Sequence, residues 1–174
     1  MRVIDRIHII VRVVQESPKI GKTAIMKCLY LIQTLKNVPL NYEFEIYTYG
    51  PYSSAVMDEI DCARQMGLIN VYGLTYPSGQ FGYSIECSEQ GKKAIEESKT
   101  VAEYSSVIDD VTLEFGNKTA VELELLSTIL FVYKTCDNKS ETDVCTIVQG
   151  IKPKFSLEEI REKFKYMQEN KHLC

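Results

Sequence analysis

The segment that decides the predicted fold is YEFEIYTYGPYSS, residues 42–54. Its first half alternates between apolar and polar side chains and is rich in aromatic and β-branched residues, which predicts a strand over residues 43–49. Gly50 and Pro51 are expected to end that strand, because proline donates no hydrogen bond to a ladder and glycine tolerates a turn. Ser53 is then expected to cap a helix, since its hydroxyl can accept a hydrogen bond from a free N–H of the first turn.

Working outward from this segment, apolar residues recur at three- and four-residue steps on both sides, which is the period of a helix with one buried face. Farther along the chain, two alternating runs flank the loop at residues 73–80, which predicts a hairpin. Ser88 is expected to cap the helix that follows. The predicted order is helix, helix, strand, helix, hairpin and helix, at residues 3–16, 22–36, 43–49, 54–66, 68–87 and from 88 onward.

The remaining residues are predicted to be helical. Four segments match the capping-box spacing or its acidic variant, and the helix expected over residues 120–135 has an apolar face wide enough to indicate central burial. Gly116 and Gly150 stand where helix C-terminal ends are expected. The four predicted helix starts are Thr100, Thr119, Ser140 and Ser156.

The predicted fold class is therefore α+β and mostly helical. The element order indicates a winged-helix-like domain over residues 1–98, with a helical extension over residues 99–174 packed on it. No internal repeat or low-complexity linker separates the two parts.

Length, composition and charge limit the classes of protein to which this chain can belong. The chain has 174 residues, a net charge of −4 and a pI near 5.3, without a run of about 18 apolar residues or a signal-peptide pattern. A cytoplasmic location is therefore expected. The six cysteines are irregularly spaced and contain no CxxC pair, which favours buried thiols over disulfides. His172 and Cys174 would make a poor metal site, so no metal or cofactor is predicted.

Enzyme motifs are weak in this sequence. It contains two histidines, and neither stands in a nucleophile motif. The run Gly21-Lys22-Thr23 lacks the earlier glycine that a phosphate-binding loop requires. Adjacent carboxylates such as Asp58 and Glu59 are interpreted as solvated helix faces. We therefore expect a non-enzymatic protein and assign no catalytic, metal-binding or cofactor-binding residue.

A winged helix normally reads DNA with its third helix and its wing. Here the third helix is expected to present Asp58, Glu59 and Asp61, and the wing at residues 73–80 contains no Lys or Arg, which disfavours phosphate contacts. A DNA-binding transcriptional regulator remains the alternative hypothesis. Its candidate DNA contacts would be Lys19, Lys22, Lys27 and Arg64.

Tyrosine dominates the predicted sheet and wing of a chain that contains eleven tyrosines and no tryptophan. Tyrosine offers a large contact area together with a hydroxyl group, which suits protein interfaces. The apolar wing tip favours a contact with a partner protein or a second copy of the chain. The candidate interaction residues are Tyr47, Tyr49, Gly50, Pro51, Tyr52, Leu74 and Tyr76.

Five segments carry a resemblance to a known family: KCLYLIQTL (27–35), FEIYTYGPYSS (44–54), MGLI (66–69), ELELLSTILFVYK (122–134) and IKPKFSLEEI (151–160). Over nearly its whole length the chain resembles the YwgA-like proteins of bacteria and archaea. Over its first half it more distantly resembles the Panacea (SocA-like antitoxin) domain.

The resemblance implies a winged-helix-like core with added helices, and neither family supplies catalytic residues to transfer. Panacea domains act as antitoxins that neutralise toxins, and some are adaptors to a protease. We therefore expect a non-enzymatic regulatory or protein-interaction module, antitoxin- or adaptor-like, with a toxin-like or regulatory protein as its partner and without a membrane.

Overall fold

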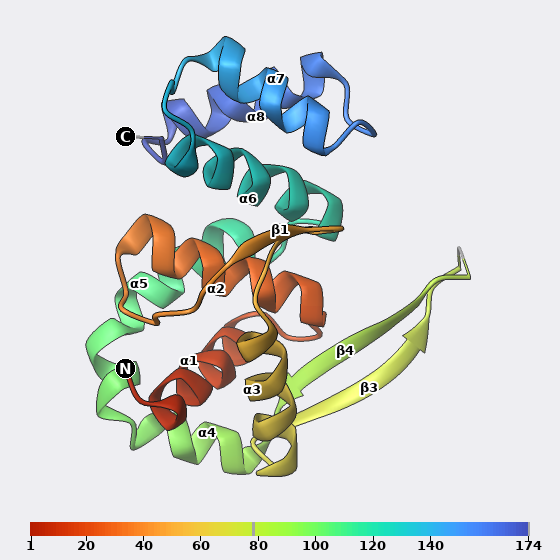
Figure 1. Ribbon diagram of the computed structural model, residues 1–174. Coiled ribbons are helices and arrows are strands. Elements are labelled where there is room, and N and C mark those ends of the chain that lie inside the picture. The colour runs from red at the N-terminus through yellow and green to blue at the C-terminus, as the bar shows by residue number, and fades with distance from the viewer. Residues whose placement is uncertain (78, 174) are drawn as a thin grey trace.

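The computed structural model describes residues 1–77 and 79–173, which form a mostly helical α+β structure with two small antiparallel sheets (Figure 1). This confirms the predicted fold class. The helices are α1 (Val3–Glu16), α2 (Lys22–Lys36), α3 (Ser54–Gln65), α4 (Glu89–Glu96), α5 (Lys99–Phe115), α6 (Ala120–Thr135), α7 (Glu141–Ile151) and α8 (Leu157–Glu169). The strands are β1 (Glu45–Tyr47), β2 (Gly50–Tyr52), β3 (Ile69–Thr75) and β4 (Phe81–Cys87).

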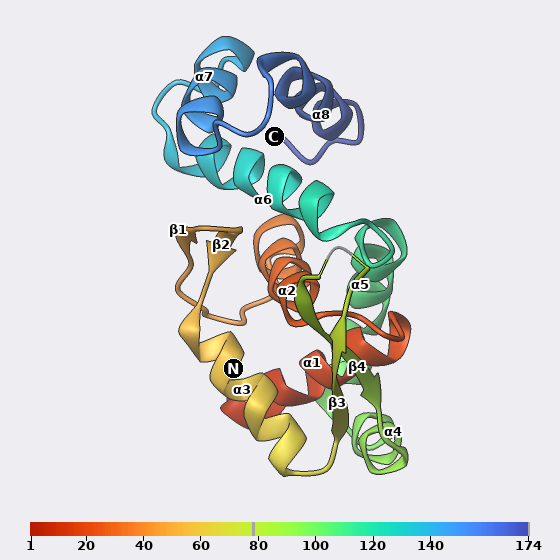
Figure 2. The same ribbon diagram turned by 90° about the vertical axis from the view of Figure 1, so that its right-hand side faces the viewer.

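The helices are arranged around α2. Helix α1 packs against α3, α4 and α5, while α2 packs against both α5 and α6. Helices α6, α7 and α8 form a layer at one end of the molecule, and the β1–β2 hairpin lies beneath α6 (Figures 1 and 2). Helix α5 therefore packs on the helices of the first half, and the domain boundary between residues 98 and 99 stays a prediction.

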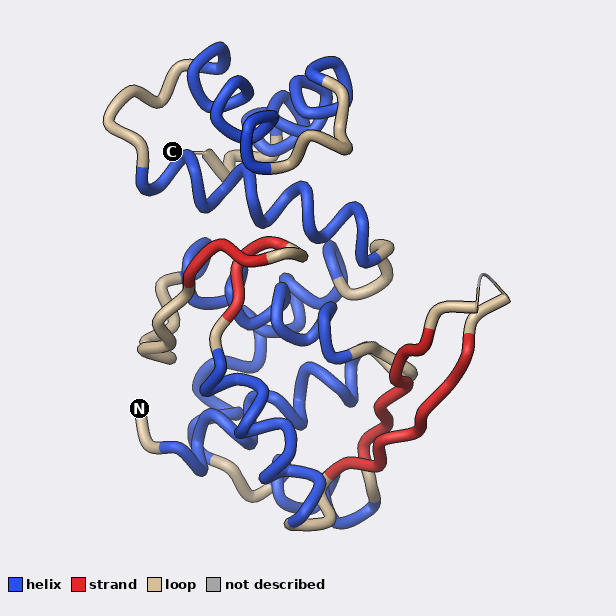
Figure 3. The backbone as a smooth tube through the Cα atoms, turned by 45° about the vertical axis from the view of Figure 1, so that its right-hand side comes forward, coloured by secondary structure: helices blue, strands red, loops and turns tan. Residues whose placement is uncertain are grey.

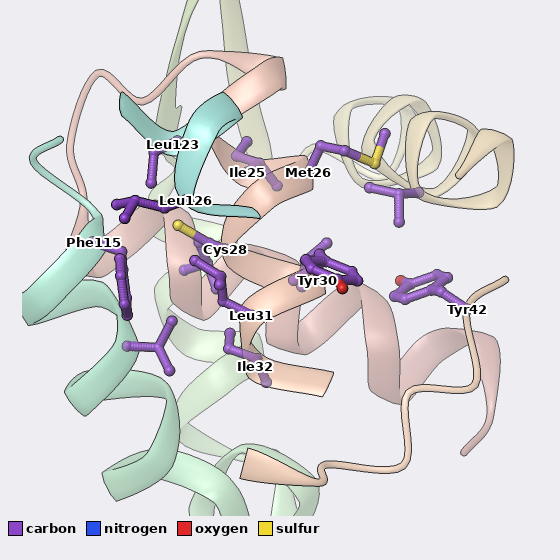
Figure 4. Packing of buried hydrophobic residues seen from close by; sticks show 14 of the residues in the cluster. Ile25, Met26, Cys28, Tyr30, Leu31, Ile32, Tyr42, Phe115, Leu123 and Leu126 are labelled. Atoms are coloured by element: carbon purple, nitrogen blue, oxygen red, sulfur yellow. The ribbon is translucent and has the colours of Figure 1, made fainter. Parts of the chain in front are cut away.

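A continuous hydrophobic core joins both halves of the chain. Figure 4 shows its centre, where Cys28, Leu31 and Ile32 of α2 lie near Phe115 of α5 and Leu126 of α6. Each fully buried aliphatic or aromatic side chain of this kind contributes about 1.5–3 kcal/mol relative to an exposed one. The central burial predicted for α6 is confirmed, because its leucines and even Ser127 and Thr128 are buried.

The β1–β2 hairpin differs from its prediction. The strand expected over residues 43–49 is only three residues long, and Gly50 and Pro51 do not end it. They instead form β2, in which Gly50 pairs with Tyr47 and Pro51 with Ile46. Local alternation could not indicate this reversal, because the hairpin is held by α6 and by two lysines from distant parts of the chain.

The β3–β4 hairpin, here called the wing, projects from the helical body (Figure 3). Strand β3 extends to Thr75, three residues beyond its predicted end, and the aromatic ring of Phe81 lies over Gly73. Ile20, between α1 and α2, forms an isolated bridge with Ile85 of β4. The helices and the wing follow the predicted order, and the identity of this unit as a winged helix stays a prediction.

The helix ends follow most of the predicted capping signals. The side chains of Ser88, Thr119, Ser140 and Ser156 accept the expected hydrogen bonds at four helix starts. The start predicted at Thr100 is wrong, because that hydroxyl donates to Asp5.

Ser98 caps α5 in place of Thr100. Ser53 occupies the N-cap position of α3, but its side chain makes no capping hydrogen bond. Gly150 lies inside α7 rather than after it, and Gly116 has an ordinary helical φ of −63°.

Candidate functional site

The β1–β2 hairpin is seated directly on α6 through its glycine. Gly50 has a φ of +89°, and a Cβ at this position would lie 3.0 Å from Oγ1 of Thr128 and 3.3 Å from the carbonyl oxygen of Glu124. Positive φ values are rarely adopted by residues with side chains. Glycine is therefore required here both by the backbone conformation and by the close approach of the hairpin to the helix.

Two buried lysines bind the backbone carbonyl groups of this hairpin. Nζ of Lys27, from α2, donates to the carbonyl oxygen of Pro51 at 2.6 Å, and Lys27 is 2% exposed. Nζ of Lys152, which follows α7, donates to the carbonyl oxygens of Tyr47, at 2.9 Å, and Thr48. Carbonyl groups next to a buried surface need such partners. The two lysines therefore hold the backbone of the hairpin in place.

Glu124 of α6 supplies the opposite charge. This carboxylate is 2% exposed and lies 3.1 Å from Nζ of Lys152 and 2.8 Å from Nζ of Lys154. Burial lowers the pKa of Lys27 from 10.5 to about 8, with the charge of Glu124 opposing and that of Lys152 assisting the change. Buried charges persist only when they are paired and hydrogen-bonded. We call Lys27, Glu124 and Lys152 the buried charge cluster.

The β1–β2 hairpin, whose backbone the two lysines hold, presents aromatic side chains to solvent. Tyr47 and Tyr49 are 63% and 58% exposed, and the ring centroid of Tyr47 lies 5.6 Å from that of Tyr52. A mostly apolar pocket of about 210 Å³ opens between these rings and the start of α2. We call the two exposed tyrosines and this pocket the hairpin site. The pocket is lined by Lys22, Thr23, Met26, Lys27, Tyr47, Tyr49, Gly50, Tyr52 and Met57.

The structure thus brings together the five candidate interaction residues from residues 47–52 and separates them from the two in the wing. Leu74 is half-buried, whereas Tyr76 is exposed, and the Tyr76 ring covers Gly82 of the opposite strand. Leu74 and Tyr76 belong to the wing and do not line the pocket of the hairpin site. The candidate interaction residues therefore belong to two hairpins.

Only two of the four candidate DNA contacts are exposed. Lys19 and Arg64 are exposed, whereas Nζ of Lys22 lies 3.2 Å from Oδ1 of Asp61. Lys27 is buried, so the phosphate contact predicted for it is not available in this structure.

The predicted acidic face of α3 also needs correction at Glu59, which points inward. Its carboxylate pairs with the guanidinium group of Arg6 and accepts a hydrogen bond of 2.5 Å from the hydroxyl group of Tyr42. Burial and the neighbouring Glu59 carboxylate raise the pKa of Tyr42. The solvated acidic face of α3 is therefore smaller than the sequence indicates. It retains Asp58 and the half-buried Asp61.

Sequence reasoning predicted neither Glu124 nor Lys152 as part of a site. A usable signal was present, because Glu124 is a lone carboxylate on the wide apolar face of the helix predicted at residues 120–135. Such a charge must find a partner when the helix is buried. The identity of that partner depends on tertiary contacts that no local pattern contains.

The cysteines only partly match the expected buried thiols. Cys28 and Cys145 are buried, Cys87 and Cys136 are half-buried, and Cys62 is exposed. Burial raises the pKa of the Cys28 thiol to about 12, so it stays protonated at neutral pH. Cys174, the second half of the weak metal pair, lies outside the described residues.

Within residues 1–77 and 79–173, no group of three or more His, Cys, Asp or Glu side chains could hold a metal ion. In the same part of the chain, no helix has the length and apolar character needed to cross a membrane.

Comparison with known proteins relates the chain to one curated protein. It is 26% identical over 156 residues to the uncharacterized protein YwgA of Bacillus subtilis (strain 168), and the match covers 89% of each chain. No family model matches the sequence. The similarity supports the resemblance to YwgA-like proteins and includes both the hairpin and the segment that contains Lys152.

Proposed function

We propose that this protein is a non-enzymatic interaction module that binds a partner protein at the hairpin site. The observation that carries the proposal is the contrast within one short hairpin. Tyr47 and Tyr49 are largely exposed, yet the backbone that presents them is bound by buried lysines and seated on α6. An interface formed by side chains on a fixed backbone loses little conformational entropy when a partner binds.

The chemistry of the surface suits a protein rather than a small molecule. The pocket of about 210 Å³ is smaller than the roughly 300–1,000 Å³ of typical small-molecule sites. It has the size and apolar lining to receive one anchoring side chain from a partner. Interface hot spots commonly consist of such an anchor in a pocket, and they are enriched in tyrosine. The two exposed rings would flank the anchor and exclude water.

An antitoxin- or adaptor-like role is the more specific form of this proposal and rests on the resemblance to the Panacea domain. In that role, the partner would be a toxin-like or regulatory protein that inserts an aromatic or aliphatic residue into the hairpin site. The acidic residues of α3 and the absence of Lys and Arg from residues 73–80 disfavour the alternative role as a regulator of duplex DNA.

The proposal is tested by capturing partners on the full-length protein from its native host and measuring the affinity of the identified partner. Tyr47→Ser combined with Tyr49→Ser should weaken binding by about 30-fold or more, as expected for loss of a hot spot. Leu113→Ser is the matched control, because Leu113 is an apolar residue of α5 that is 83% exposed. Equal affinity of the double variant and the parent, with unchanged melting temperatures, would contradict the proposal.

A further inference from the structure

A second cavity lies at the base of the wing, and Lys22 and Thr23 line both this cavity and the pocket of the hairpin site. The volume of the second cavity is about 420 Å³, which is within the range of small-molecule sites. It is bounded by the segment between α1 and α2, by the segment between α5 and α6, and by the wing. We call this cavity the wing groove.

The lining of the wing groove is positively charged. Lys19, Lys22 and Lys118 line it, and none of its lining residues is Asp or Glu. This composition is unusual for a chain in which 24 acidic residues outnumber 20 basic ones. Nζ of Lys22 also contacts Asp61 at the edge of α3, while Lys19 is exposed in a left-handed conformation with a φ of 67°. The groove therefore gathers three lysines in a chain whose net charge is −4.

Aromatic rings form the wing side of the same groove. Phe81, Tyr83 and Tyr76 line it, and the ring centroids of Phe81 and Tyr83 are 5.2 Å apart. Phe81 is 66% exposed, so a large part of its ring is open to a ligand. No Asp, Glu, Lys or Arg occurs between Asn70 and Glu86, which leaves these rings without charged neighbours along the hairpin.

We infer that the wing groove binds a nucleotide unit, with a phosphate group at Lys19 and Lys118 and the base against the ring of Phe81. Lysines beside exposed aromatic rings are the combination by which proteins bind single-stranded nucleic acids, because every base has a face that can stack. A free nucleotide and one residue of a single strand present this same chemistry. The inference is independent of the hairpin site and does not require that site to bind a protein.

The experiment measures binding of the full-length protein to a fluorescent oligothymidylate of about ten residues by anisotropy, with AMP and inorganic phosphate as competitors. The parent protein should bind the oligonucleotide with a dissociation constant of about 1–100 µM. Lys19→Asn with Lys118→Gln should weaken binding at least tenfold. It should also reduce the slope of log K against log salt by about 1.4 for two phosphate contacts. Asparagine is chosen because it tolerates the left-handed backbone at residue 19.

Two further variants separate stacking from charge. Phe81→Leu should weaken binding about fivefold or more with an unchanged salt slope, because it removes only a stacking surface. Lys93→Gln with Lys99→Gln removes two exposed lysines outside the groove and should leave binding within about twofold.

Competition by AMP would identify a free nucleotide as the ligand, and binding of the oligonucleotide without such competition would identify a single strand. The inference fails if neither nucleotide probe binds. It also fails if inorganic phosphate competes as well as AMP, or if the control pair weakens binding as much as the groove pair.

Discussion

Nζ of Lys152 lies 2.9 Å from the carbonyl oxygen of Tyr47, so an exposed aromatic residue is positioned through its backbone by a buried cation. Because the bond is made to the backbone, the ring of Tyr47 is left open to solvent. Two of the segments that carry the YwgA-like resemblance, residues 44–54 and 151–160, thus meet at this bond.

Replacing Lys152 tests how much this arrangement stabilises the fold. Lys152→Met leaves two carbonyl oxygens without a donor and removes the buried cation that is paired with Glu124, and it should lower the free energy of unfolding by about 3–5 kcal/mol. Lys154→Met is the control, because Lys154 contacts the same carboxylate but has a half-exposed side chain. It should cost about 1 kcal/mol or less. Urea denaturation measures both changes, and equal losses would show that the buried hydrogen bonds of Lys152 contribute little.

Gly50 and Gly79 allow backbone strain to be separated from close packing. Both have positive φ values, of +89° and +83°, but a Cβ would meet α6 only at Gly50 and would have no atom within 4 Å at Gly79. Gly79→Ala should therefore cost about 1 kcal/mol for the backbone alone. Gly50→Ala should cost about 2–3 kcal/mol because the hairpin must also move away from Thr128. Thermal melting with calorimetry compares them, and an unchanged midpoint for Gly50→Ala would contradict the tight seat of the hairpin.

The adjacent carboxylates Asp58 and Glu59 should respond very differently to truncation. Glu59→Ala removes the buried partner of the half-buried Arg6 guanidinium and should destabilise the protein by about 3–5 kcal/mol. Asp58→Ala alters an exposed residue of the same helix and should change stability by about 0.5 kcal/mol or less. If chemical denaturation gives similar small values for both, the inward position of Glu59 is incorrect.

The low pKa of Lys27 should make stability depend on pH. The folded protein releases this proton near pH 8 and the unfolded chain near pH 10.5, so the unfolded state binds more protons between these values. Stability should accordingly rise with pH across this window, relative to Lys27→Met, which cannot titrate. At about 1.36 kcal/mol per pKa unit, the gain is at most about 3–4 kcal/mol. Denaturation of both proteins between pH 7 and 10.5 measures it, and a constant difference would contradict the low pKa.

Duplex DNA should bind weakly at physiological salt, because α3 retains exposed acidic character and the wing tip has no cation. A duplex of random sequence in an anisotropy titration should give a dissociation constant weaker than about 1 µM. Sub-micromolar, sequence-selective binding in a screen of genomic fragments would instead support the regulator hypothesis, with Lys19 and Arg64 as the first contacts to examine.

Local patterns predicted the long helices well and the hairpin poorly, for one physical reason. The periodicity of α1, α2 and α3 comes from residues within a few turns of each other, so it can be recognised in the sequence alone. The reversal at residues 48–49 depends on hydrogen bonds to Lys152, which lies more than a hundred residues away. The inward turn of Glu59 similarly depends on Arg6, 53 residues earlier.

The candidate sites were also predicted only in part, because they too depend on contacts between distant segments. The sequence indicated that Tyr47 and Tyr49 belong to a contact surface, but it did not indicate the pocket beside them, whose walls come from α2, α3 and the hairpin. Of the three lysines in the wing groove, the sequence indicated only Lys19 and Lys22, as candidate DNA contacts. The third lysine, Lys118, joins them only because α6 begins beside the loop that precedes α2.

The position of Lys152 has a consequence for the protein during its synthesis. The residues of β1 and β2 leave the ribosome long before Lys152 does, since about a hundred residues separate the two segments. Chains grow at roughly 5–20 residues per second, so this interval lasts about 5–20 seconds. Throughout it the nascent hairpin lacks Lys152, and for most of it the hairpin also lacks α6. The surface proposed to receive a partner is therefore completed only late in translation, which ties recognition to possession of an intact C-terminal half.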